Sequence, residues 1–148
     1  MKTTQIAEII ESKPSTCDVG ANSFCDAYLT IKTNKHTICA FLHEINGGFR
    51  PEAWFLKLIG KKKIQLKFLN LKSSTPLIKK YSIKAINKKN AKYKITGKVI
   101  DKKISKKGKK SYDQLTVNCG FIFTTLTDLN KYSIGDYINM EGRLDIFL

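Results

Sequence analysis

Lysine side chains are the most abundant chemically active groups of this 148-residue sequence, which has a net charge of +15, and they are concentrated in one region. Residues 57–110 contain twenty lysines and a single acid, Asp101, so this block carries +19 while the remainder of the chain carries −4. Such an excess attracts a polyanion, because each phosphate contact releases condensed counterions. Biased base composition in a genome also enriches lysine, but a uniform bias would not leave the acids outside the block. The charge pattern therefore predicts a nucleic acid as the partner.

Arginine is scarce among the basic residues. Only Arg50 and Arg143 are arginines, and all other basic residues are lysines. Arginine forms the bidentate contacts that read guanine edges, whereas lysine acts as a flexible point charge. The composition therefore indicates contacts to the nucleic-acid backbone without strong sequence preference.

The elements that position these lysines are best defined in residues 92–148, where the pattern predicts four short strands. In the first strand, apolar positions alternate with positions that are nearly all lysine: Tyr93, Ile95, Gly97 and Val99 on one face, Lys92, Lys94, Lys98 and Lys102 on the other. Gly97 is expected to mark a bulge or a sharp bend. In the last strand, apolar residues recur at alternate positions from Ile138 to Leu148. A period of two is typical of half-buried strands.

Two short patterns in this region resemble the OB-fold of single-stranded nucleic-acid-binding proteins. The first is I-x-G-x-V at residues 95–99, followed by a basic hairpin and a strand pair, and the second is GDYINMEGRL at residues 135–144. The resemblance covers residues 92–148 and implies a small β-barrel of five strands. Because only four strands are predicted here, the resemblance implies that the fifth comes from before Lys92.

The resemblance and the charge pattern together give a set of candidate nucleic-acid contacts. Single strands are held by a basic groove and by aromatic side chains on which bases stack. The hairpin loop 103–110 corresponds to the first-to-second-strand loop that often grips ligand in proteins of this kind. The candidates come from the hairpin, from the predicted outer face, and from Trp54 with the lysines that follow it: Lys94, Lys98, Lys102, Lys103, Lys106, Lys107, Lys109, Lys110, Tyr112, Gln114, Tyr137, Arg143, Lys61, Lys62, Lys63 and Trp54.

The preceding segments are expected to complete a single compact domain over residues 1–148. Residues 1–14 carry isoleucines at helical spacing and end at Pro14, which predicts a short N-terminal helix or arm. Residues 15–91 predict further strands and a short apolar helix around Trp54. No internal repeat is strong enough to indicate two copies of one unit. The expected fold is mainly β, an OB-like small β-barrel with extra strands and one or two short helices.

Groups suited to catalysis or to tight metal binding are scarce. The acids are scattered rather than clustered as a magnesium-dependent nuclease requires, and no glycine-rich phosphate loop is present. His36, Cys39, His43 and Cys25 lack the paired C-x-x-C spacing of structural zinc sites. We therefore expect a protein that is not an enzyme and that has no metal site and no cofactor.

Cysteine usage and hydropathy bear on the compartment. Four cysteines at irregular spacing do not suggest a disulfide scaffold, so reduced thiols are expected. No apolar run of about 20 residues could span a bilayer, and the first residues lack the apolar core of a signal peptide. We expect an intracellular protein with no membrane partner.

The predicted function is non-catalytic binding of single-stranded DNA, favoured over RNA, through backbone charge and base stacking, in support of replication, repair or recombination. A different class stays open: an accessory subunit whose N-terminal and Trp54 helices dock a polymerase, a primase or another replication protein. An RNA- or ribosome-associated factor fits the lysine excess equally well. The sequence also leaves a homo-oligomer open.

Overall fold

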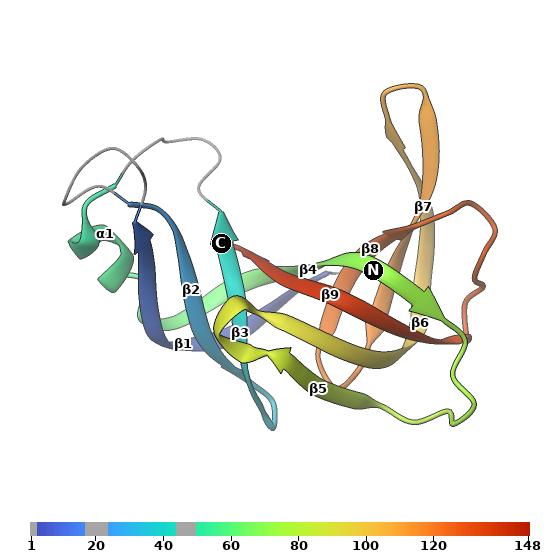
Figure 1. The fold of residues 1–148 in the computed structure, drawn as a ribbon, viewed down its shortest axis with the longest axis horizontal. Helices are drawn as coiled ribbons and strands as arrows, with labels where there is room; N and C mark the ends of the chain where they lie inside the picture. The colour runs from blue at the N-terminus through green and yellow to red at the C-terminus, as the bar shows by residue number, and fades with distance from the viewer. Residues whose placement is uncertain (1–2, 17–23, 44–49) are drawn as a thin grey trace.

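The computed structural model of the chain describes residues 3–16, 24–43 and 50–148, and within them the protein is mainly β (Figure 1). One α-helix and one short 3-10 helix accompany nine strands. In chain order the elements are β1 (Thr4–Thr16), β2 (Phe24–Thr33), β3 (His36–His43), α1 (Glu52–Leu56), β4 (Gly60–Ser74), β5 (Ser82–Asn87), η1 (Lys88–Asn90), β6 (Lys92–Lys107), β7 (Lys110–Asn118), β8 (Ile122–Thr127) and β9 (Tyr137–Phe147).

The strands pair in two rings that share β4 and β9. In the first ring β1, β2, β3, β9 and β4 pair in succession, and β4 pairs back with β1. In the second ring β6, β7, β8, β4 and β9 pair in succession, and β9 pairs back with β6. Each ring contains one short parallel pairing, between β3 and β9 at Phe41 and Asp145, and between β4 and β8 at Lys67 and Thr124. β5 extends the sheet beyond β6.

The two rings repeat one pattern of pairing and burial. Exchanging β1, β2, β3 and β4 for β6, β7, β8 and β9 converts the first ring into the second, with the same parallel and antiparallel neighbours. β3 and β8 also share a burial pattern. In residues 38–42 of β3 and in residues 123–127 of β8, the first three positions are buried, the fourth is half-buried and the fifth is buried. The sequence did not reveal this repeat, because the shared features are pairing and burial rather than residue identity.

The N-terminal segment is a strand, so the helix expected within residues 1–14 is wrong. β1 pairs with β4 over its first six residues and with β2 from Glu8 onward. Its isoleucines do not share one face, because Ile9 is fully buried while Ile6 is 73% exposed. Pro14 lies where β1 pairs with β2 alone, and proline is tolerated at such an edge. β-Branched isoleucine favours an extended backbone, and pairing with distant strands outweighs the helical spacing.

The other elements follow the expected order with different bounds. Among the strands expected within residues 15–91, β4 pairs with β8 and β9 and so supplies a fifth strand to the four C-terminal strands. α1 covers five residues and is shorter than the apolar segment around Trp54. β2 and β3 form a hairpin, in which Thr33 pairs with His36 across a turn where Asn34 has a φ of 50°.

Glycine permits close approach of strands at two positions. A Cβ atom at Gly142 of β9 would collide with the carbonyl oxygen of Leu69 in the neighbouring strand β4. A Cβ atom at Gly97 of β6 would lie 2.6 Å from Cγ1 of Val117 in β7. β6 pairs with β9 without a register shift at Gly97, so the bulge expected there is absent. The glycine instead allows β6 and β7 to pack closely.

The oxidation state of one cysteine differs from the expectation. Cys25 is disulfide-bonded, so the expectation of reduced thiols is wrong at this residue. Sequence spacing alone does not show which cysteines meet in space. Cys39 and Cys119 are buried free thiols, and burial raises the pKa of Cys119 to about 12.

Two further expectations concern membranes and metals. Among the described residues, no helix is long and apolar enough to cross a bilayer. The same residues contain no group of three or more histidine, cysteine or acidic side chains placed to hold a metal ion.

Candidate nucleic-acid interface

A β-bulge in β6 determines which lysines share a face. Lys98 lies on the outer side of the sheet, because its neighbour Val99 is fully buried. Between Val99 and Asp101 the register of β6 against β7 shifts by one residue, and a shift of one residue reverses the side to which later residues point. Beyond the bulge, Lys103 therefore continues the outer side and Lys102 turns to the inner side.

After the bulge, β6 and β7 form a hairpin that projects from the rest of the molecule (Figure 1). The cross-strand partners on its outer side are Asp101 with Thr116, Lys103 with Gln114, Ser105 with Tyr112, and Lys107 with Lys110. The Nζ atom of Lys110 lies 5.2 Å from the centroid of the Tyr112 ring. This side of the hairpin therefore presents positive charge around a half-buried aromatic ring.

Two tyrosines lie at the base of the hairpin. Lys98 pairs with Asn118 of β7 and with Tyr137 of β9. The rings of Tyr81 and Tyr137 have centroids 6.1 Å apart and are tilted by 34°. The Nδ2 atom of Asn118 donates a hydrogen bond to the Tyr81 hydroxyl at 3.5 Å. We define the outer hairpin face as Lys98, Lys103, Lys107, Lys110, Tyr112, Gln114, Asn118 and Tyr137.

Lys102 is directed away from the outer hairpin face. Its Nζ atom donates a hydrogen bond to the carbonyl oxygen of Tyr132 at 3.2 Å and lies 3.8 Å from Oδ2 of Asp113. Asp113 is only 2% exposed and also accepts a hydrogen bond from the backbone nitrogen of Asn130 at 2.8 Å. The prediction that Lys102 shares a face with Lys98 is wrong, because the bulge lies between them.

The remaining hairpin lysines surround the turn. Lys106 lies opposite Ser111 on the inner side of the hairpin. Lys109 follows Gly108, whose φ of 62° belongs to the left-handed region that favours glycine. Both lysines are exposed. They add positive potential to the hairpin without sharing the side on which Tyr112 lies.

Two predicted contacts take part in ion pairs. The Nζ atom of Lys94 lies 3.8 Å from Oε1 of Glu141, and both side chains are partly exposed. Arg143 donates two hydrogen bonds to the Asp145 carboxylate, at 2.6 and 3.1 Å, and its guanidinium lies 4.5 Å from the Phe41 ring centroid. Hydrogen bonding to Asp145 raises the pKa of Arg143. The charge of Arg143 is therefore already compensated within the protein.

The candidates around Trp54 belong to the first ring and lie away from the hairpin (Figure 1). The half-buried Trp54 ring has the guanidinium of Arg50 4.8 Å from its centroid and packs edge-on against the fully buried Phe55. Lysines 61–63 are exposed at the start of β4, where it pairs with β1. The structure does not bring these residues to the outer hairpin face.

Sequence reasoning missed Tyr81 and Asn118. The alternation of β7 does place Asn118 on the same side as Tyr112 and Gln114, so a signal for Asn118 was present. Tyr81 precedes β5 and meets Tyr137 only through the fold. No local pattern around Tyr81 indicates that contact.

Comparisons with known proteins did not reveal a relative. No protein-family model matches the chain, and searches of the curated proteins and of the solved structures gave no significant match. The geometry and the charge of the outer hairpin face are therefore the observations from which we infer a function.

Proposed function

We propose that this protein is a non-catalytic binder of single-stranded nucleic acid, with DNA favoured over RNA. The observation that carries the proposal is the outer hairpin face, where Tyr112 lies among Lys103, Lys107 and Lys110. Lysines neutralise phosphates, and an aromatic ring offers a stacking surface worth about 1–3 kcal/mol per base. Lys110 lies over the Tyr112 ring, so a phosphate contact and a stacking contact lie next to each other on this face.

The second ring of strands supports an OB-like arrangement as part of this proposal. β6, β7, β8, β4 and β9 provide the five strands that an OB barrel needs. The β6–β7 hairpin takes the place of the first-to-second-strand loop, and β7 and β8 take the place of the strands that bind oligonucleotides in that fold. β1, β2, β3 and β5 are then the extra strands.

The proposed role is to protect or present a single strand during replication, repair or recombination. Phosphate contacts fix position but carry no direct sequence information, and lysine reads base edges less specifically than arginine. A face that combines lysines with an aromatic ring therefore suits strands of any sequence. The same face would also serve an RNA-associated factor, which is why RNA belongs among the test ligands.

Fluorescence anisotropy with labelled oligo-dT, oligo-U and a matched duplex, across a salt series, tests the proposal. We expect single-strand binding that exceeds duplex binding, weakens as salt rises and is stronger for oligo-dT than for oligo-U. The double variant Lys103→Ala/Lys107→Ala should weaken single-strand binding about tenfold and lower the salt slope by about 1.4, or about 0.7 for each lost phosphate contact.

A matched control removes the same charge from the other ring. Lys61→Ala/Lys62→Ala should leave the affinity within about twofold of the wild-type value, because screening limits the range of exposed charges to about 10 Å. If the two double variants weaken binding equally, net charge alone determines affinity and the outer hairpin face is not the site.

The accessory-subunit hypothesis has less support than strand binding. It needs two docking helices, but β1 occupies the position of the first. α1 has five residues, its Phe55 is fully buried, and Trp54 packs against Arg50. Strand binding therefore remains the function that we propose.

A further inference from the structure

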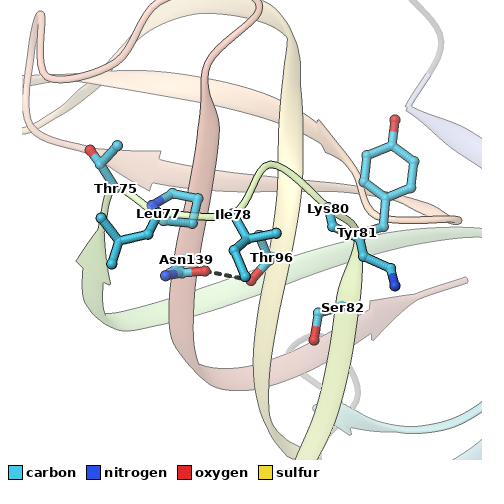
Figure 2. Close-up of a pocket in the computed structure, with 9 residues that line it drawn as sticks. Thr75, Leu77, Ile78, Lys80, Tyr81, Ser82, Thr96 and Asn139 are labelled. Atoms are coloured by element: carbon cyan, nitrogen blue, oxygen red, sulfur yellow. Dashed lines mark hydrogen bonds between the residues drawn. The ribbon is translucent and has the colours of Figure 1, made fainter.

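The segment between β4 and β5 forms a pocket outside the outer hairpin face. Residues 75–81, which we call the strap, cross the outer side of β9 and β6 on their way from β4 to β5 (Figure 2). All strap residues except Lys79 line a cavity of about 600 Å³, together with Ser82 of β5, Thr96 of β6 and Asn139 of β9. This volume falls within the range of about 300–1,000 Å³ that is typical of small-ligand sites.

The strap forms an apolar wall that the protein itself does not cover. Leu77 is fully exposed and Ile78 is 74% exposed. Both line the pocket next to Pro76, and Figure 2 shows Ile78 beside Thr96. Apolar side chains exposed around a concave site are typical of surfaces that bind a ligand.

The floor of the pocket is polar and has a defined donor. Oγ1 of Thr96 donates a hydrogen bond to Oδ1 of Asn139 (Figure 2). The Asn139 oxygen thus already accepts one hydrogen bond, whereas its Nδ2 group donates none to the described residues and can donate to a ligand. No acidic residue lines the pocket, whereas Lys80 does. The site therefore suits a flat, partly apolar group that carries a hydrogen-bond acceptor and lies close to negative charge.

Tyr81 connects this pocket to the outer hairpin face. It lines the pocket, and its ring and hydroxyl contact Tyr137 and Asn118 of that face. A strand that runs along the hairpin, past Asp101 and Lys98, therefore reaches the pocket at Tyr81.

We propose that the strap pocket receives one unpaired base of the bound strand, an inference that rests on the proposed single-strand binding. The strap packs against the base, Nδ2 of Asn139 donates to a carbonyl oxygen of the base, and Lys80 lies near the adjoining phosphate. Asparagine recognises adenine by using its oxygen and its nitrogen together, and here the hydrogen bond from Thr96 holds the oxygen and competes with the adenine amino group for it. The pocket therefore favours thymine or uracil, which carry carbonyl oxygens, over adenine, which has none.

Anisotropy with oligo-dT and oligo-dA of equal length tests the pocket. Asn139→Ala should lower the affinity for oligo-dT about three- to tenfold, the range expected for one lost hydrogen bond, and should leave oligo-dA binding within about twofold. Ile78→Ala should lower oligo-dT binding about threefold. Ile104→Ala, at an exposed isoleucine outside the pocket, should change neither affinity.

The outcomes separate the pocket from the function on which it rests. Absence of single-strand binding by the wild-type protein would overturn the proposed function itself. Salt-dependent strand binding in which both pocket variants keep the wild-type affinity for oligo-dT would overturn the pocket alone. Because Ile78 is exposed, Ile78→Ala decides the question even if Asn139→Ala does not fold.

Discussion

Individual residues of the outer hairpin face contribute to strand binding in two ways that can be separated. Lysine contacts depend on salt because they release counterions, whereas stacking on Tyr112 depends on contact with a base and much less on salt. Each contribution therefore has its own experimental signature.

Tyr112→Ala should weaken single-strand binding by about 1–3 kcal/mol, because it removes the ring on which a base stacks. The salt slope should change little, since no charge is lost. Anisotropy titrations at three salt concentrations measure both quantities. Tyr112→Phe keeps the ring and should retain most of the affinity; if it loses as much as the alanine variant, stacking is not the role of Tyr112.

Lys98 and Lys102 should differ although both belong to β6. Lys98→Ala should reduce the salt slope by about 0.7, the value for one phosphate contact on a single strand. Lys102→Ala should leave the slope unchanged and lower the free energy of unfolding by about 1–3 kcal/mol, because the buried Asp113 carboxylate loses its cation. Titrations and urea unfolding of both variants measure this contrast, and a reduced slope in Lys102→Ala would contradict it.

Cys119 gives the folded protein a sensitivity to high pH. Burial raises the pKa of its thiol from 9.0 to about 12, so the folded protein keeps a proton that the unfolded chain releases. The associated stability is fully present below pH 9 and is lost as the pH rises toward about 12. Cys119→Ala should therefore show a smaller drop in Tm between about pH 8 and pH 10.5 than the wild-type protein. An equal drop would show that other groups control alkaline stability.

Among the elements, the pair β4–β9 has the strictest steric requirement. Gly142→Ala should lower the free energy of unfolding by about 3 kcal/mol or more, because its Cβ would collide with a backbone carbonyl that cannot rotate away. Gly108→Ala, which meets no neighbouring atom, should cost only about 1–2 kcal/mol from its left-handed φ. Urea unfolding of both variants measures the difference, and equal losses would argue against the close approach of β4 and β9.

The C-terminal strands could be predicted because each one alternates along its own sequence. β9 shows the clearest case, with every second residue buried. Helical spacing at Ile6, Ile9 and Ile10 misled the prediction for β1, because its partners lie far away in the chain. The predicted alternation of faces in β6 is also wrong beyond Val99, because a bulge reverses it there. The sequence alone does not distinguish a bulge after Val99 from a bend at Gly97.

The candidate site was predicted in part for the same reasons. The hairpin and Tyr112 follow from local charge and alternation, and the structure places Lys103, Lys107 and Lys110 around Tyr112. The contact between Tyr81 and Tyr137 depends on the path of the strap, which no local pattern encodes. The charge composition also led to the prediction that lysines 61–63 share a site with the hairpin, although the two groups of lysines lie on different rings.

At the scale of the whole molecule, neither ring is complete without a strand from the other half of the chain. A fragment covering residues 92–148 lacks β4 and should give the far-UV circular dichroism of an unfolded chain. Mixing it with residues 1–91 should restore β structure, because β4 then pairs with β8 and β9. A cooperative thermal transition in residues 92–148 alone would contradict this dependence.

The sharing of β4 and β9 makes the chain the intramolecular counterpart of a strand-swapped homodimer, in which each subunit lends its fourth strand to the other. A true homodimer must carry every surface charge twice, on both subunits. In a single polypeptide the two units that correspond to subunits, β1–β4 and β6–β9, can differ in sequence. Here the basic hairpin projects from the unit β6–β9 (Figure 1). The unit β6–β9 can thus specialise in ligand contact while the unit β1–β4 contributes β4 and packing. A symmetric dimer does not allow its two subunits to differ in this way.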